Sequence, residues 1–348
     1  MKKPVIAVIF GGCSTEYEIS LQSAYAVLTH FDRETYAALP IGITREGQWF
    51  LYSGPLERIP DNRWQEEGYS LPCAISPDRT KKEILVFSNS TIHYKIDAAF
   101  PVLHGKNGED GTIQGLLELA GIPVIGCGAL SSALCMDKDR AHKLVSLAGI
   151  PVPRSEVLPS CSQDESWLQA AGEIGFPLFV KPVRSGSSFG IAQVASEKEL
   201  LPAVREAAKH DSEIILEENV PGFEVGCAVM GNESLTVGQV DEIELSDGFF
   251  TYEEKYTLKT SKIHCPARIP KEKAEEIRET AKKIYQVLDC RGFARIDMFL
   301  TPEGKVIFNE ANTIPGFTSH SRYPSMMKGI GLSFDQLVSR IIALGVGR

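Results

Sequence analysis

The stretch Val5-Ile-Ala-Val-Ile-Phe-Gly-Gly12, followed by Ser20-Leu-Gln-Ser-Ala-Tyr-Ala-Val-Leu28, decides the fold class. Its first part is a continuous apolar run rich in β-branched residues, and its second part places apolar residues at helical spacing. A glycine-rich turn joins the two parts. The sequence therefore predicts a strand, a loop and a helix, which is how a parallel α/β unit begins.

Short apolar runs alternate with helical patterns along the rest of the chain. The expected strands cover residues 37–43, 98–103, 122–125, 178–181 and 214–217, and the expected helices cover residues 115–120, 138–147 and 271–288. Residues 53–80 contain scattered proline and glycine, which predicts a surface excursion. A chain of 348 residues exceeds the size of one hydrophobic core, so we expect three units, over residues 1–126, 127–217 and 218–348.

Composition excludes several classes of protein. The net charge is −9 and no Lys/Arg cluster stands out, so a nucleic-acid partner is not expected. The first apolar run is too short for a signal-peptide core, and no stretch approaches the length of a membrane span. Eight cysteines are scattered without a C-x-x-C pair, which is typical of reduced thiols. We expect a cytoplasmic protein with small-molecule substrates.

A predicted hairpin over residues 294–312 carries the strongest chemical signal. Strand alternation places Arg295 and Asp297 on one face. A four-residue turn that pairs Leu300 with Lys305 would set Asp297 opposite Phe308.

With that pairing, Glu310 and Asn312 share the face of Asp297, so three oxygen ligands converge. Carboxylate and amide oxygens suit Mg²⁺, which prefers a few protein oxygens together with water and substrate phosphates. A salt-bridged surface hairpin is the commoner use of charged strands. The asparagine on the same face and the Gly/Pro loop that follows favour the metal site.

A second signal is Leu178-Phe-Val-Lys-Pro-Val-Arg-Ser-Gly-Ser-Ser-Phe-Gly190, a strand that delivers Lys181 into a Gly/Ser loop. Backbone N–H groups of such a loop can cover phosphates while the lysine supplies a point charge. The loop lacks the Gly-Lys-Ser/Thr ending of a Walker A motif. Taken alone, it also fits a flexible turn beside a lysine that reaches solvent.

Two further loops follow buried strands, where ligands bind in open α/β sheets. One runs from His104 to Gly111 and is rich in glycine and acids. A single histidine is more often structural than catalytic, and His104 is a candidate on the strength of its loop. The other, Gly11-Gly-Cys-Ser-Thr-Glu16, also fits a tight turn in which Ser14 caps the next helix.

Together these segments resemble the D-alanine-D-alanine ligase family of the ATP-grasp fold. The resemblance rests on motifs in the family's order from residue 5 to about residue 335: Gly11-Gly-x-Ser-x-Glu16, His104-Gly-x-x-Gly-Glu-Asp-Gly111, Met136-Asp-Lys138, Lys181-Pro with Gly186-Ser-Ser188, Arg295-x-Asp297 and Glu310-x-Asn312-Thr-x-Pro-Gly316. It implies an α/β and α+β chain of three domains: an N-terminal Rossmann-like domain that binds substrate, a central ATP-grasp domain and a C-terminal catalytic domain.

Within that family, residues 253–259 and 318–324 look like the D-alanine-D-serine ligases of the VanG type, which are associated with vancomycin resistance. Ordinary members typically have leucine at the position of Arg322. A guanidinium there would pair with Asp241 and leave a polar pocket beside Phe250 for a hydroxymethyl side chain. The resemblance thus implies ligation of D-alanine with D-serine through an acyl phosphate, for peptidoglycan precursors.

The resemblance also implies a role for individual residues. It places ATP between the second and third units, with Lys138, Lys181 and Ser188 at the phosphates, Glu217 and Glu224 at adenine and ribose, and Asp297, Glu310 and Asn312 around Mg²⁺ (two ions, with Mn²⁺ able to substitute). It assigns Glu16 to the ammonium of the first amino acid and His104 to the vicinity of its carboxylate, with Ser187 and Tyr256 in a hydrogen-bonded link with Glu16. It assigns Lys255 and Ser321 to the second carboxylate. It assigns Arg295 and Gly316 to the oxyanion. Residues 246–262 would form a mobile loop that closes over the site.

Alternative functions differ in what they require. An ordinary D-alanine-D-alanine ligase would use Arg322 only to satisfy a surface carboxylate. A nucleotide-binding regulator with the same fold would have lost a metal ligand or a phosphate lysine, and none is lost. A dehydrogenase would need the third glycine of G-x-G-x-x-G after Gly11-Gly12. The family also implies a homodimer through the first domain.

Overall fold

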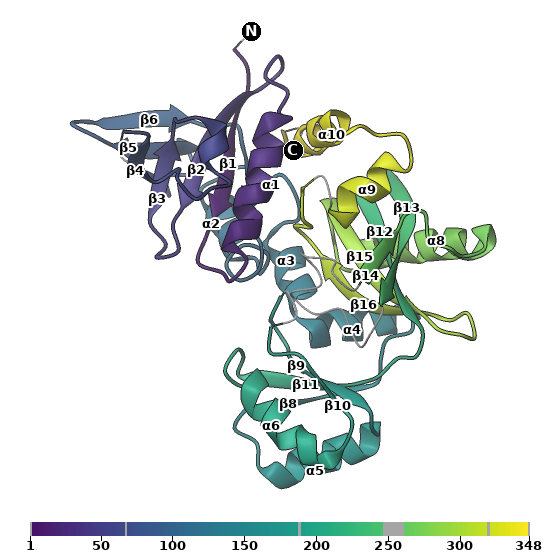
Figure 1. Cartoon of the computed structure of the whole chain (residues 1–348). Helices are drawn as coiled ribbons and strands as arrows, with labels where there is room; N and C mark the ends of the chain where they lie inside the picture. The colour runs from purple at the N-terminus through teal and green to yellow at the C-terminus, as the bar shows by residue number, and fades with distance from the viewer. Residues whose placement is uncertain (1, 67, 187–188, 246–260, 319–320, 347–348) are drawn as a thin grey trace.

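The computed structural model describes residues 2–66, 68–186, 189–245, 261–318 and 321–346, whose strands form three sheets that follow one another along the chain (Figure 1). The mixed α/β fold class predicted from sequence is confirmed, and the structure shows how the three parts meet around one pocket.

The first unit is a sheet with the strand order β6-β5-β4-β3-β2-β1-β7. Its elements are β1 (Val5–Gly11), α1 (Tyr17–Thr29), β2 (Ala37–Ile43), β3 (Trp49–Tyr52), the 3₁₀ turn η1 (Leu56–Arg58), β4 (Ser70–Ile75), β5 (Glu83–Phe87), β6 (Thr91–Lys95), β7 (Ala98–Val102) and α2 (Thr112–Leu119). Strand β1 lies parallel to β2 and β7, as its continuous apolar sequence predicts, and the strands from β2 to β6 pair antiparallel.

Two expectations for the first unit are wrong. Residues 53–80 are not a surface excursion, because they contain β4 and the fully buried Trp64. The Trp64 ring packs edge-on against Phe10 at 5.2 Å, and a Cβ atom on Gly42 would lie 2.4 Å from it. Residues 122–125 make only one bridge, from Val124 to Ala99, and form no strand.

The second unit is a small antiparallel sheet with the order β10-β9-β11-β8 and two helices packed on it. Its elements are β8 (Ser155–Pro159), α5 (Asp164–Ile174), β9 (Leu178–Pro182), β10 (Ala192–Val194), α6 (Glu197–Ala207) and β11 (Glu213–Glu218). The helices α3 (Ala129–Met136) and α4 (Lys138–Leu147) precede it, and α4 has the predicted bounds.

The third unit is a five-stranded antiparallel sheet with the order β14-β13-β12-β15-β16. Its elements are β12 (Phe223–Gly231), β13 (Leu235–Leu245), β14 (Ser261–His264), α8 (Lys271–Val287), β15 (Gly292–Leu300), β16 (Val306–Asn312), α9 (Arg322–Lys328) and α10 (Phe334–Val346). Helix α8 is polar except for the face made by Ile277, Ala281, Ile284 and Tyr285, which is buried against the sheet.

The predicted hairpin exists, but its register differs from the expected one. Leu300 pairs with Val306 and not with Lys305, because the turn is closed by the Lys305 carbonyl, which accepts from the N–H of Thr301 at 3.0 Å. A bulge then shifts the pairing again, so that Asp297 lies opposite Glu310 and not opposite Phe308. Arg295 lies opposite Asn312.

The first and third units share one apolar core. It joins residues of β1, α1 and β7 to β15, α9 and α10, and Figure 1 shows α10 beside α1. Phe100, Phe293 and Phe317 meet at its centre, with ring centroids 5.4 to 6.1 Å apart. This shared core fixes the first unit against the third on one side of the pocket.

Candidate active site

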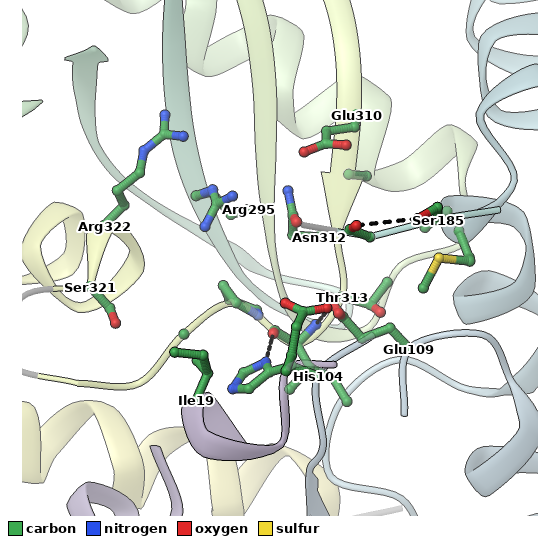
Figure 2. Close-up of a pocket in the computed structure, with 18 of the residues that line it drawn as sticks. Ile19, His104, Glu109, Ser185, Arg295, Glu310, Asn312, Thr313, Ser321 and Arg322 are labelled. Carbon is green, nitrogen blue, oxygen red and sulfur yellow. Dashed lines mark hydrogen bonds between the residues drawn. The ribbon is translucent and has the colours of Figure 1, made fainter. Parts of the chain in front are cut away.

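A cavity of about 180 Å³ opens where the three units meet (Figure 2). Nine residues predicted from sequence line it: Glu16, His104, Lys138, Arg295, Glu310, Asn312, Gly316, Ser321 and Arg322. Five more lie behind this lining as partners of other side chains: Lys181, Glu217, Glu224, Asp241 and Asp297. The remaining five lie outside the described residues: Ser187, Ser188, Phe250, Lys255 and Tyr256.

The predicted closing loop lies mostly outside the described part of the chain, which lacks residues 246–260. Its last two residues, Ser261 and Lys262, belong to strand β14 and pair with β13. The loop as predicted therefore extends too far by these two positions.

On the third unit, strands β15 and β16 present an acid and an amide side by side. Arg295 donates to both oxygens of the buried Asp297 at 2.7 to 3.0 Å, and the Asn312 amide donates to the same carboxylate at 2.9 Å. Burial acts to lower the pKa of Arg295, but Asp297 outweighs it and raises that pKa above its ordinary value. Arg295 therefore stays charged at the pocket wall.

Arg322 is a buried cation surrounded by carboxylates from three strands, β12, β13 and β15. It binds Asp241 through two N–H groups, at 2.8 Å each, and Glu224 at 2.7 Å, and it lies 3.4 Å from Asp297. Burial acts to lower the pKa of Arg322, but Asp241, Asp297 and Glu224 raise it well above its ordinary value. The predicted pairing with Asp241 is present, and Asp241 is fully buried rather than at the surface.

The carboxylate of Glu224 accepts from Arg322 at 2.7 Å, and its role at ribose stays a prediction. Glu224 stands on β12, the strand next to β15, which explains why Arg322 reaches it and Asp297 together. Arg322 thus connects the expected ribose residue with the expected metal ligand, a link that no sequence pattern indicated.

Two lysines lie close to the Gly/Ser loop, one at the start of α4 and one on β9. Lys138 starts α4 and donates from Nζ to the Ser185 carbonyl at 2.7 Å, while its N–H binds the Val183 carbonyl at 3.2 Å. Lys181 forms a buried ion pair with Glu217. Burial acts to raise the pKa of Glu217, but Lys181, His142 and Lys138 together hold that pKa below its ordinary value.

One oxygen of Glu217 is buried without a hydrogen-bond partner. The Nδ1 atom of His142, whose ring lies in the same buried region, also has none. Buried polar atoms are nearly always paired, so a ligand that offers hydrogen bonds fits here.

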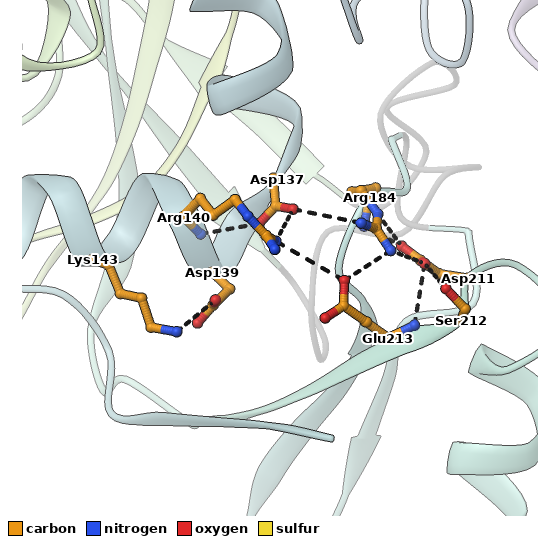
Figure 3. Close-up of polar contacts among 8 residues, drawn as sticks. All are labelled: Asp137, Asp139, Arg140, Lys143, Arg184, Asp211, Ser212 and Glu213. Carbon is orange, nitrogen blue, oxygen red and sulfur yellow. Dashed lines mark hydrogen bonds and ion pairs between the residues drawn. The ribbon is translucent and has the colours of Figure 1, made fainter. Parts of the chain in front are cut away.

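Charged side chains fasten the Gly/Ser loop to α4 (Figure 3). Arg184 donates to Asp211 at 2.7 Å and to Glu213 at 3.0 Å, and it lies 3.9 Å from Asp137. Asp137 also caps α4 by accepting from the Arg140 N–H at 3.0 Å. The network joins the end of β9, the start of β11 and the start of α4.

His104 is buried, and both of its ring nitrogens are occupied. Nδ1 lies 2.9 Å from the Ile314 carbonyl, and Nε2 lies 3.0 Å from the Ser23 hydroxyl. Burial lowers the pKa of His104, so the ring is neutral. These contacts leave no ring nitrogen to bind a substrate carboxylate directly.

Sequence reasoning assigned no role to Glu109 or Ser23. Glu109 lines the pocket and accepts from the N–H groups of Gly105 at 2.8 Å and Ile314 at 3.1 Å. Glu109 belongs to the loop motif over residues 104–111, five residues after His104, and this position could have identified it as a site residue. Ser23 is an ordinary helix residue by sequence, so nothing in the pattern distinguished it.

No helix among the described residues is long and apolar enough to cross a bilayer.

Comparison with known proteins places this geometry in context. A family model described as D-ala D-ala ligase N-terminus matches residues 5–127, and one described as D-ala D-ala ligase C-terminus matches residues 144–343. A D-alanine-D-alanine ligase of Caldicellulosiruptor bescii is 46% identical, over 99% of this chain and 96% of that protein. The vancomycin B-type resistance protein VanB of Enterococcus faecalis is 45% identical over the whole of both chains.

Among solved structures, the VanG D-Ala:D-Ser ligase from Enterococcus faecalis is 57% identical, with a TM-score of 0.92 over 99% of both chains. The D-alanine-D-alanine ligase from Coxiella burnetii is 33% identical, with a TM-score of 0.88 over 100% of this chain and 95% of that one.

Proposed function

Because the chain belongs to the D-alanine-D-alanine ligase family, whose members are ATP-dependent ligases, we propose that it joins D-alanine to D-serine. The observation that carries this proposal is the buried Arg322 on the pocket wall, held by Asp241 and Glu224. The likeness to VanB and to the VanG D-Ala:D-Ser ligase supports a product that enters peptidoglycan precursors and confers vancomycin resistance.

The reaction that fits the pocket has two steps. The carboxylate of the first D-alanine attacks the γ-phosphate of ATP, which gives an acyl phosphate and ADP. The amine of the second amino acid then attacks the acyl carbon, and phosphate leaves as the peptide bond forms. No protein nucleophile takes part, so the work of the chain is orientation and charge neutralisation.

Each step has residues suited to it. Lys138 and Lys181 would neutralise the phosphates, beside the loop that contains Ser188, and the unpaired oxygen of Glu217 would accept from adenine. Glu16 would receive the first ammonium, linked to Ser187 and Tyr256. Arg295 and the Gly316 N–H would stabilise the oxyanion.

The side chains at the hairpin fit a magnesium ion. Asp297 and Glu310 are cross-strand neighbours, and Asn312 stands two positions further along the same face, so two carboxylates and an amide oxygen gather there. No group of three His, Cys, Asp or Glu in the described ranges is arranged to hold a metal, which agrees with an open site completed by phosphates. Bound Mg²⁺ would neutralise charge on the transferring phosphoryl group.

Arg322 supplies the basis for choosing D-serine. Three of its five N–H groups are used by Asp241 and Glu224, and Asp297 lies 3.4 Å from Nη1, so the second N–H of Nη2 would donate to a substrate hydroxyl. Ser321 and Lys255 would hold the second carboxylate next to it, and Phe250 would close the apolar side. A site built to bind a hydroxyl leaves a polar group unpaired when D-alanine enters instead, which costs binding.

The test is the identity of the product. The enzyme is given ATP, Mg²⁺ and D-alanine, with and without D-serine, and the dipeptide is identified by mass. D-Ala-D-Ser as the main product supports the proposal. D-Ala-D-Ala alone would keep the ligase activity and overturn the substrate, in favour of the ordinary activity named for the Caldicellulosiruptor relative.

An Arg322→Leu variant sharpens the test. We expect the preference for D-serine over D-alanine to fall by about 10- to 100-fold, the effect of losing one charged hydrogen bond. Arg268→Leu is the matched control. Arg268 pairs with Glu242, which follows Asp241 on β13, and neither Arg268 nor Glu242 lines the pocket. An unchanged preference in Arg322→Leu would show that the selectivity lies elsewhere.

A further inference from the structure

The backbone segment from Ile314 to Phe317 carries Gly316, whose N–H the proposed mechanism uses. This segment belongs to the third unit, yet side chains of the first unit hold it at both ends. The Ile314 N–H donates to Glu109, the Ile314 carbonyl lies against His104, and the Phe317 N–H donates to Ser23 at 3.2 Å. Figure 2 shows His104 and Glu109 side by side at this segment.

The hydrogen-bond directions in this group are fixed by chemistry. A carbonyl only accepts, so Nδ1 of His104 carries the proton and donates to Ile314. The neutral ring then accepts at Nε2, so the Ser23 hydroxyl donates to it. The Ser23 oxygen in turn accepts from Phe317. Every donor in this series of hydrogen bonds has an acceptor, and this selects the tautomer of His104 with its proton on Nδ1.

Glu109 completes the hold from the other side of Ile314. Its two oxygens accept one N–H from its own loop, at Gly105, and one from the third unit, at Ile314. Both backbone groups of Ile314 are therefore bound by side chains of the loop 104–111, much as a residue in a β-ladder is bound through its N–H and its carbonyl. Among charged groups, Glu16 raises and Arg295 lowers the pKa of Glu109, and His104 is neutral.

We propose that Ser23, His104 and Glu109 form a clamp that positions the Gly316 N–H for the oxyanion of the second step. The clamp rests on the proposed function of Gly316. Its members are positioning residues, because they act through the backbone of the 314–317 segment. It joins the unit expected to bind the first amino acid to the segment that stabilises the transition state.

The test separates the two chemical steps. Acyl phosphate formation is followed with D-alanine alone, by positional exchange of ¹⁸O in the β,γ-bridge of labelled ATP, and ligation is followed as dipeptide. For Glu109→Gln and for Ser23→Ala, we expect ligation to fall by about 10- to 100-fold while exchange changes less than about threefold, because a small misplacement of an oxyanion donor is costly.

Ser20→Ala is the matched control. Ser20 is a fully buried serine one turn earlier on α1, and its hydroxyl binds the backbone of Gly11 and Val102, not the 314–317 segment. It should lower stability without changing the ratio of ligation to exchange. Thermal unfolding of each variant identifies any effect of misfolding, which would reduce both rates together.

Three outcomes decide the matter. A selective loss of ligation in both variants supports the clamp. Normal ligation in both, or equal loss of ligation and exchange in folded variants, overturns it. The exchange assay on Lys138→Ala tests the proposed function separately, because that variant should lose exchange whatever the clamp does.

Discussion

The two junctions that enclose the pocket are stabilised by different kinds of interaction, apolar packing in one and ion pairs in the other. The first and third units meet through the shared apolar core around Phe100, Phe293 and Phe317, and the clamp adds buried hydrogen bonds to it. The second unit has a core of its own, centred on Trp167, and the charged network of Arg184 (Figure 3) fastens its Gly/Ser loop to α4, whose Ala141 and Val145 pack in the core of the third unit.

This difference indicates how each junction responds to change. Salt does not screen apolar contacts, whereas it screens exposed ion pairs. We therefore expect transition-state geometry to depend on the apolar junction and ATP binding to depend on the charged one. Changes of charge at each junction test this division.

The largest effect is expected at Asp297, which is a proposed metal ligand and also binds Arg295. Asp297→Asn should reduce turnover by about a thousandfold, since it removes charge from the proposed metal site at a cost of about 4 kcal/mol in the barrier. Phosphate release measures this loss. Glu303→Gln removes a charge from the exposed turn of the same hairpin and should have no effect. Full turnover of Asp297→Asn would contradict the site.

Strand alternation was enough to predict that Asp297, Glu310 and Asn312 share a face, although the predicted register was wrong. The turn is one residue longer than expected, which alone would have moved Glu310 to the opposite face. The bulge at Asn309 shifts the register once more and restores the face. Two one-residue differences cancel, and neither has a signal in the sequence.

Contacts between distant segments were the part that the sequence did not predict. The motifs identified His104 and the pairing of Arg322 with Asp241, because a resemblance carries residue types with it. The role of Ser23 depends on a segment almost 300 residues away, since its hydroxyl accepts from Phe317. The Arg184 network likewise joins residues that are separate in sequence.

The next effect in size concerns the stability of the third unit, in which Arg322 and Asp241 both lie. Arg322→Leu leaves the fully buried Asp241 without its partner, so we expect the free energy of unfolding to fall by about 3 to 5 kcal/mol. Urea denaturation measures it. The double variant Arg322→Leu with Asp241→Leu removes both charges and should recover much of this loss. Equal instability of the single and double variants would mean that the ion pair is not the cause.

A smaller effect follows from pH. Desolvation by the surrounding protein, then Glu16, raises the pKa of Glu109 from 4.5 to about 8. Between these values the native state keeps a proton that the unfolded chain has lost, so stability falls as pH rises.

From about pH 6 to about pH 7 the fall is at most about 1.4 kcal/mol for this group. It is measured as the difference between the unfolding free energies of the parent protein and Glu109→Gln, in which the group does not titrate. Parallel pH curves for the two proteins would show that Glu109 has an ordinary pKa.

The smallest effect is expected at the charged junction. Arg184→Gln removes its ion pairs with Asp211 and Glu213 while Lys138 and the Gly/Ser loop stay in place. Because Arg184 is 39% exposed, each pair is partly screened, and we expect the KM for ATP to rise by only about 5- to 10-fold. The KM for D-alanine should not change, since we expect that substrate to bind beside Glu16, at the apolar junction.

Arg205→Gln is the control for this last variant, because Arg205 pairs with Asp164 at 3.5 Å on the helices of the same unit. Salt gives an independent measurement. Raising the ionic strength should increase the KM for ATP of the parent protein more than that of Arg184→Gln, which has already lost the screened pairs. If the KM for ATP responds equally to salt in both proteins, the Arg184 network does not govern ATP binding. The proposed difference between the two junctions would then be wrong for the charged junction.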